Sequence, residues 1–108
     1  MTIYQAAPAK RLEGSGLRKP GVARQLAAGS SSANTALTST CERISIIATG
    51  ADIRYAIGTS AQTANAGTSH FIKQNERVEL DLPSGANIAF IRDASTDGVA
   101  EVTEFENY

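Results

Sequence analysis

The sequence predicts an all-β fold, a small antiparallel β-sandwich of jelly-roll-like form that is preceded by an extended N-terminal arm. From about residue 37, apolar and polar residues alternate with a period of two, as in strands that bury one face. Turn-forming Gly, Pro, Asn and Asp residues separate the apolar runs roughly every 8–12 residues, which is typical of a sandwich or a small barrel. No segment of helical length interrupts these runs, so parallel βαβ connections are not expected.

We expect two parts, an arm over residues 1–35 and a sandwich domain over residues 36–108. The arm contains two of the three prolines and two Gly/Ser runs, at 14–16 and 29–34, which are linker signals. Between these runs, residues 22–28 have the pattern of about two helical turns, although so short a helix is marginal alone. We therefore expect the arm to be extended and to become ordered on a partner.

The charge of the chain divides at the same boundary. The arm carries five basic residues and one acidic residue, a net charge of +4. Residues 36–108 carry five basic and ten acidic residues, a net charge of −5. A basic arm on a small acidic domain indicates a protein that docks on a large partner.

Length and composition allow one small domain, because 108 residues suffice for no more. A sandwich of this size buries only roughly 60% of its unfolded surface, and this one contains no Trp. Small domains of this kind gain stability by assembling, so we expect a homo-oligomer or a permanent partner. No apolar run approaches the ~18 residues of a membrane span, and the first residues lack the pattern of a signal peptide. We expect no membrane association.

The first two expected strands cover residues 41–48 and 52–57. Residues 49–51 make a tight connection between them, so the two strands are predicted to form a hairpin. The alternation places the following side chains on the inner face: Ile44, Ile46 and Ala48 in the first strand, and Ile53, Tyr55 and Ile57 in the second.

The second half of the domain begins with residues 61–72, which are small and polar and fit either an edge strand or a loop. Strands are then expected at 77–82, 87–91 and 99–105, with Asp97-Gly98 as the turn before the last strand. The run at 87–91 is almost continuously apolar, as in a strand covered on both faces. The other expected inner residues are Val78, Leu80 and Leu82 in the first of these strands, and Val102 and Phe105 in the last.

No constellation of residues predicts a reaction. His70 follows Ser69, but a base and its nucleophile also need an orienting group and an oxyanion site, so we expect an exposed or strand-capping histidine. One His and one Cys supply half the ligands of a structural zinc site. Cys41 is expected to be a small filling residue, because only Arg43 is placed to lower its pKa. We predict a protein that is not an enzyme and has no cofactor, no metal site and no catalytic residue.

Two further patterns resemble ligand sites. Five carboxylates near the last strand offer oxygens to a divalent cation, but they lack the spacing of a calcium loop, so a solvated acidic face is expected. The glycine-containing run at 14–21 has no Gly-Lys-Ser/Thr ending and no preceding strand, which argues against a nucleotide site. The five acidic residues are Asp93, Asp97, Glu101, Glu104 and Glu106.

The arm is the candidate partner-binding site. Its basic residues would neutralise nucleic-acid phosphates, contact an acidic protein surface, or belong to a solvated tail. Nucleic acid is the less favoured partner, because the five basic residues spread over 15 positions with no interleaved aromatic residues. We expect protein docking, with Tyr4, Leu12, Leu17, Val22 and Leu26 as apolar anchors and Arg11, Arg18, Lys19 and Arg24 as charged contacts.

The order of strands and turns resembles a known class of proteins. The runs that carry the resemblance are residues 41–58, 69–72, 76–83 and 86–94, followed by Gly98 and by Val102-Thr103-Glu104. Together they cover about residues 41–105 and resemble small β-sandwich virion proteins of tailed bacteriophages.

The resemblance implies a structural protein of the virion that is assembled in the host cytoplasm. Its implied partners are the major capsid protein or other virion proteins, and its implied role is capsid decoration or cementing. A neck, tail or baseplate component is the first alternative, and a nucleic-acid-binding module that uses the basic arm is the second. A carbohydrate-binding module is less expected, because most aromatic residues are needed for the core.

Overall fold

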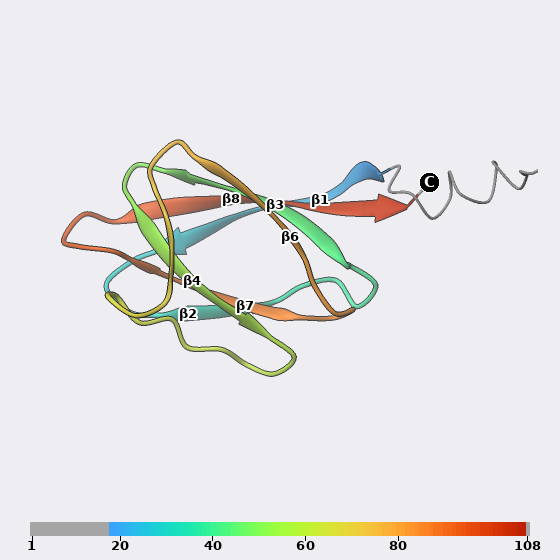
Figure 1. Cartoon of the computed structure of the whole chain (residues 1–108), viewed down its shortest axis with the longest axis horizontal. Coiled ribbons are helices and arrows are strands. Elements are labelled where there is room, and N and C mark those ends of the chain that lie inside the picture. The colour runs from blue at the N-terminus through green and yellow to red at the C-terminus, as the bar shows by residue number, and fades with distance from the viewer. Residues whose placement is uncertain (1–17, 108) are drawn as a thin grey trace, which may run out of the picture.

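The computed structural model describes residues 18–107, which form two four-stranded antiparallel sheets packed face to face (Figure 1). One sheet has the strand order β1-β8-β3-β6, and the other has the order β2-β7-β4-β5. Eight strands in this order make a jelly roll, so the predicted all-β sandwich is confirmed. The strands are β1 (Arg18–Ala28), β2 (Ala33–Ala36), β3 (Arg43–Thr49), β4 (Ile53–Gly58), β5 (His70–Ile72), β6 (Arg77–Asp81), β7 (Asn87–Arg92) and β8 (Gly98–Asn107).

The hydrophobic core lies between the two sheets, where alternate residues of each strand meet. The inner faces predicted for residues 41–48 and 52–57 are confirmed, because their apolar members are buried or packed on the core. In β6, Val78 and Leu80 also pack on the core but stay partly exposed. The largest fully buried apolar side chains are Phe90, Ile44, Ile46, Ile53, Ile72, Ile88 and Val102.

The predicted hairpin of the strands at 41–48 and 52–57 is wrong. β3 pairs with β6 and β8, whereas β4 pairs with β5 and β7, so the two strands lie in different sheets. Gly50, with φ of 83°, turns the chain from one sheet to the other. Alternation cannot separate the two arrangements, because inner faces of both sheets meet the same core.

Burial in β8 corrects one predicted core residue. Val102 is buried as expected, but Phe105 is only half-buried. Successive residues of a strand point to opposite faces, so Phe105 lies on the outer face and Glu104 takes the inner position beyond Val102. A carboxylate therefore stands at the end of the core.

The segment between β4 and β5 is a loop for most of its length, and only His70–Ile72 pairs as a strand. The loop reaches the far edge of its sheet, where the amide of Gln62 donates to Asn34 Oδ1 (2.9 Å) and that of Ala64 donates to Ser32 Oγ (2.8 Å). It must then cross the outer face to return to β5. This course explains why Ala89, on the outer face of β7, is fully buried.

The predicted boundary between residues 35 and 36 is wrong for the described part of the arm. β1 pairs along β8 from Arg18 opposite Asn107 to Ala28 opposite Gly98, and β2 pairs with β7. The two turns of helix expected at 22–28 are therefore strand. The long β8 offers a ladder of backbone partners that a short isolated helix lacks. The sandwich begins at Arg18, and residues 1–17 of the predicted arm lie outside the described residues.

No helix within residues 18–107 has the length and apolar character needed to cross a membrane.

Candidate docking site at the start of β1

The first residues of β1 contain a β-bulge. Pro20 pairs with Phe105, whereas Ala23 pairs with Thr103, so one extra residue is inserted in β1 between these pairs. β1 is an edge strand, which is where a sheet tolerates proline. Gly21 allows a close approach here, because a Cβ at this position would lie 2.7 Å from Glu106 Oε2. Val22 lies in the bulge and is 41% exposed.

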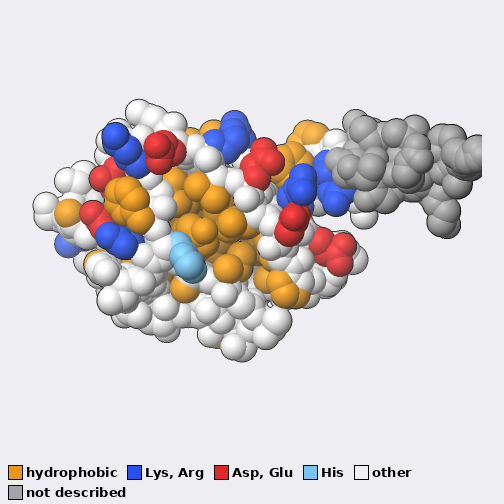
Figure 2. Space-filling view, viewed as in Figure 1, with side chains coloured by type: hydrophobic (Ala, Val, Ile, Leu, Met, Phe, Trp, Pro, Cys, Tyr) orange, Lys and Arg blue, Asp and Glu red, His pale blue; other side chains and the backbone are white. Residues whose placement is uncertain are grey.

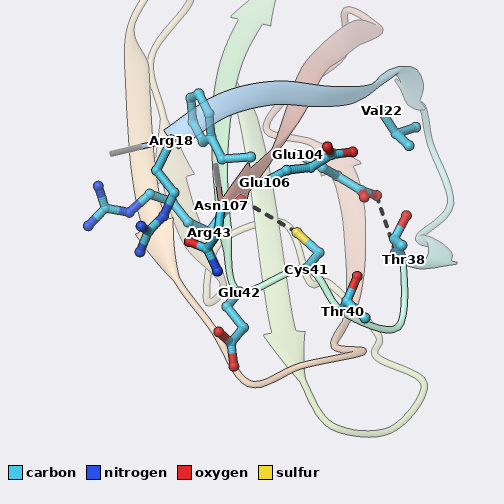
Figure 3. Close-up of a pocket in the computed structure, with 11 residues that line it drawn as sticks. Arg18, Val22, Thr38, Thr40, Cys41, Glu42, Arg43, Glu104, Glu106 and Asn107 are labelled. Carbon is cyan, nitrogen blue, oxygen red and sulfur yellow. Dashed lines mark hydrogen bonds between the residues drawn. The ribbon is translucent and has the colours of Figure 1, made fainter. Parts of the chain in front are cut away.

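Beside the bulge, a cavity of about 290 Å³ opens at this end of the sandwich (Figure 3). Its walls come from three segments: the start of β1, the connection from β2 to β3, and the last residues of β8. The lining residues are Arg18, Val22, Thr38, Thr40, Cys41, Glu42, Arg43, Glu104, Phe105, Glu106 and Asn107.

Glu104 forms the inner wall of the cavity, and its side chain is only 2% exposed. Arg24 Nε donates to Glu104 Oε2 (2.8 Å), and the backbone N–H of Thr38 donates to the same oxygen (3.3 Å). Burial raises the pKa of Glu104, but the hydrogen bonds from Thr38 and Arg24 outweigh it and leave the pKa below its ordinary value. The carboxylate is therefore charged at neutral pH. It links β8 to β1 through Arg24 and to the connection from β2 to β3 through Thr38.

Cys41 lies deeper in the same end of the sandwich and is buried. Its thiol donates to the backbone oxygen of Arg43, with an Sγ–O distance of 3.4 Å. Burial raises the pKa of the Cys41 thiol, and the nearby charge of Glu104 adds to this. A neutral, enclosed thiol is a poor nucleophile, so Cys41 acts here as a filling residue.

The rim of the cavity carries charges of both signs. Arg43 Nε lies 2.8 Å from Asp81 Oδ1, and Lys19 Nζ lies 4.0 Å from Glu106 Oε1. The hydroxyl of Ser84 donates to Glu42 Oε2 (2.9 Å). Such a rim suits a polar protein surface better than a small apolar ligand.

The structure divides the predicted partner contacts into three groups. Arg18, Lys19 and Val22 lie at the exposed start of β1, where a partner can reach them. Arg24 and Leu26 point toward the interior, one to Glu104 and the other to the core, so their prediction as docking contacts is wrong. The remaining predicted contacts, Tyr4, Arg11, Leu12 and Leu17, lie outside the described residues.

The histidine and its neighbouring serine do not form a catalytic pair. Ser69 Oγ accepts the amide of Asn65 (2.8 Å), whereas the ring of His70 lies against Tyr55 with centroids 5.1 Å apart. His70 is exposed at the end of a short strand, as the sequence predicts.

The five acidic residues near β8 are dispersed. Glu104 points inward, Glu101 accepts from Gln25 on the outer face, and Glu106 lies near Lys19. Asp93 and Asp97 pair with arginines, at 2.7 Å from Arg54 Nε and 2.8 Å from Arg92 Nη1. Within residues 18–107 no three His, Cys, Asp or Glu side chains are grouped to hold a metal ion.

Sequence reasoning missed Glu104 as the acceptor that Arg24 and Thr38 share. The signal was present in β8, where Glu104 follows Val102 by two residues and must share its face. Recognising it requires that Arg24 be placed on a strand beside β8, which the arm interpretation did not do.

Fold and site together define a class, a small jelly-roll module with a polar cavity at one end. Comparisons of the chain with protein-family models, curated proteins and solved structures found no match.

Proposed function

We propose that this protein is a non-enzymatic virion structural protein, a capsid decoration or cement protein that docks on a major capsid protein and stabilises the shell. The observation that carries the proposal is the jelly-roll order of the eight strands. Viral capsid proteins use this architecture, as do lectins and cupins. Because a fold does not assign a function, these uses must be separated by the interior and the surface.

The interior favours a structural role. The space between the sheets is filled by side chains such as Ile44, Ile46, Ile88 and Phe90, all of which are buried. A cupin-like site would need a group of metal-binding side chains inside the sandwich, and residues 18–107 present none.

The surface offers little for sugar recognition, which relies on exposed aromatic faces. In the described part of the chain, the exposed large hydrophobic residues are Val22 and Phe71. Phe71 stands alone, with the guanidinium of Arg54 5.0 Å from its ring centroid. A docking module therefore fits the surface better than a lectin does.

The start of β1 is the proposed contact with the shell. Arg18 and Val22 line the cavity there, and the chain enters the sandwich at the same place. Residues 1–17 would extend the contact area on the shell or on a neighbouring copy, with Tyr4, Leu12 and Leu17 as apolar anchors and Arg11 as a charged contact. A segment that becomes ordered on a partner lets a small domain cover a wide surface.

The test is the copy number of this protein relative to the major capsid protein, measured by quantitative mass spectrometry of purified virus particles. A ratio near one per capsid subunit, or one per few subunits, is expected for a shell protein. A ratio of a few per hundred would assign the protein to a neck, tail or baseplate, the alternative within the same class. Absence from particles would overturn the proposal and leave the nucleic-acid alternative to be tested by salt-dependent DNA binding.

A further inference from the structure

One side of the sandwich is open. β6 and β5 are the edge strands on this side, and β5 pairs only with the first three residues of β4, Ile53 to Tyr55. The second half of β4 therefore has no partner on this side within residues 18–107. Figure 2 shows a group of apolar side chains exposed here, on the side where β4 and β6 face the viewer in Figure 1.

The burial of individual residues confirms the opening. Val78 and Leu80 of β6 and Ile57 of β4 point toward the core, yet all three stay partly exposed. His70 shares the inner face of β5 with Ile72, but Ile72 is buried and His70 is exposed. Side chains that point inward and remain exposed indicate a strip of core without a cover.

The edge of β6 presents unpaired backbone groups. The amide of Leu82 donates to the Glu42 oxygen (2.9 Å), and that of Ala48 donates to the Glu76 oxygen (3.4 Å). In an antiparallel ladder, hydrogen-bonded pairs alternate with non-bonded pairs. The N–H and C=O groups of Arg77, Glu79 and Asp81 must therefore point away from β3, where they can accept a further strand.

The acidic residues along the β6 edge indicate which kind of strand can pair with it. Glu76 and Glu79 form no ion pair within residues 18–107, and Asp81 pairs with Arg43. Antiparallel pairing of β6 with β6 of another copy, centred on Glu79, would place the two Glu79 carboxylates opposite each other, which is unfavourable. The same register would place Arg77 opposite Asp81, but Asp81 is already paired with Arg43. The edge therefore fits a strand with basic residues.

We propose that the segment of residues 1–17 from a second copy of this chain binds along the open edge of β6, and that copies associate by this exchange of arms. The segment contains Ile3 and Tyr4, which favour strands, and the basic pair Lys10-Arg11, with Glu13 as its one acid. Its net charge is +1. An added strand gains main-chain hydrogen bonds from the edge and apolar contacts from the strip beside it.

The position of the segment favours a second copy. Its length suffices for the contact, since seventeen extended residues span about 56 Å and the five residues of β6 roughly 17 Å. β1 starts beside the last residues of β8, so the chain enters the sheet from beyond its end. β1 is also the edge opposite to β6, so the segment of the same chain would have to reverse and cross the sheet.

The test is the association of the full chain, measured by sedimentation equilibrium, with Glu79→Pro and Glu79→Thr as matched variants. Proline at position 79 removes the outward N–H and leaves the ladder to β3 intact, whereas threonine keeps that N–H and loses only the carboxylate. We expect Glu79→Pro to weaken association about 100-fold, and Glu79→Thr to weaken it less than about 10-fold. Far-UV circular dichroism checks that both variants fold.

A synthetic peptide of residues 1–17 gives a second measurement. It is expected to dissociate the wild-type assembly and to bind Glu79→Thr at least about 10-fold more tightly than Glu79→Pro. A monomeric wild-type chain, or equal association of the two variants, would overturn the proposal, including the case in which the segment folds back on its own chain. These measurements need no particle, so their failure would leave the proposed docking on a shell untouched.

Discussion

Arg24 Nε lies 2.8 Å from Glu104 Oε2, and this ion pair links the edge strand β1 to the central strand β8 on the inner face of their sheet. The sequence predicts both residues to face outward, Arg24 as a docking contact and Glu104 as part of an acidic face. Their actual position makes the start of the sandwich depend on a partly buried charge pair. Removal of one partner then leaves the other charge without compensation.

The first prediction concerns the strength of this link. Glu104→Ala is expected to lower the free energy of unfolding by about 3 kcal/mol, because Arg24 and the Thr38 amide both lose their acceptor. The measurement is equilibrium urea unfolding. Glu101→Ala is the matched control on the outer face of the same strand, with an expected loss within about 0.5 kcal/mol. Equal losses of unfolding free energy in the two variants would show that the Arg24–Glu104 ion pair does not stabilise the fold.

The second prediction concerns pH. The folded pKa of Glu104 is lowered, so the carboxylate contributes stability that is present above its unfolded pKa and is lost as pH falls through the folded value. The stability difference between wild type and Glu104→Gln should therefore be largest at pH 6–7 and shrink below about pH 4.5. Urea titrations at several pH values measure it. A difference that grows on acidification would contradict the lowered pKa.

The third prediction concerns the thiol. Burial raises the pKa of Cys41, so a thiol reagent should modify the native protein at pH 8 at least about 100-fold more slowly than the protein in 8 M urea. Absorbance during reaction with an aromatic disulfide reports the rate. Rapid labelling without urea would mean that the end cavity opens often enough to expose the sulfur.

The parts of the fold that the sequence predicts are those set by local alternation. Ile44, Ile46 and Val102 are buried as expected, because a period of two specifies a face wherever one side of a strand meets a core. The pairing of strands is not local. Whether β4 joins β3 or β7 depends on which sheet the chain enters after Gly50, and both choices bury Ile53 equally well.

The candidate site could not be predicted for the same reason, because it depends on long-range strand pairing. Taken alone, the segment before residue 36 has linker signals such as Pro20 and Gly29, and its basic charge suggests that it is exposed to solvent. Only the neighbouring β8 reveals that Arg24, Leu26 and Ala28 form an inner face, since their partners lie 70 or more residues away in the sequence. Long-range pairing of this kind overrides local composition.

The fourth prediction separates the two boundaries by truncation. Deletion of residues 1–17 should preserve the cooperative thermal unfolding of the chain, because the sandwich begins at Arg18. Deletion of residues 1–28 should abolish it, because β8 loses its ladder to β1, Glu104 loses Arg24, and the core loses Leu26 and Ala28. Circular dichroism melts of both truncations, at equal low concentration, compare them directly.

We expect a large difference between the thermal melts of the two truncations, because the loss of β1 removes several stabilising interactions at once. An unpaired β8 would present open backbone groups along an apolar face, and Glu104 would be left as a buried charge with one hydrogen bond in place of two. Substitution of Ala27, which is exposed on β1, by threonine provides a control that keeps the strand and should not change the melt by more than a few degrees. A cooperative melt for the longer deletion would restore the boundary at residue 36 and make β1 a strand added from outside the domain.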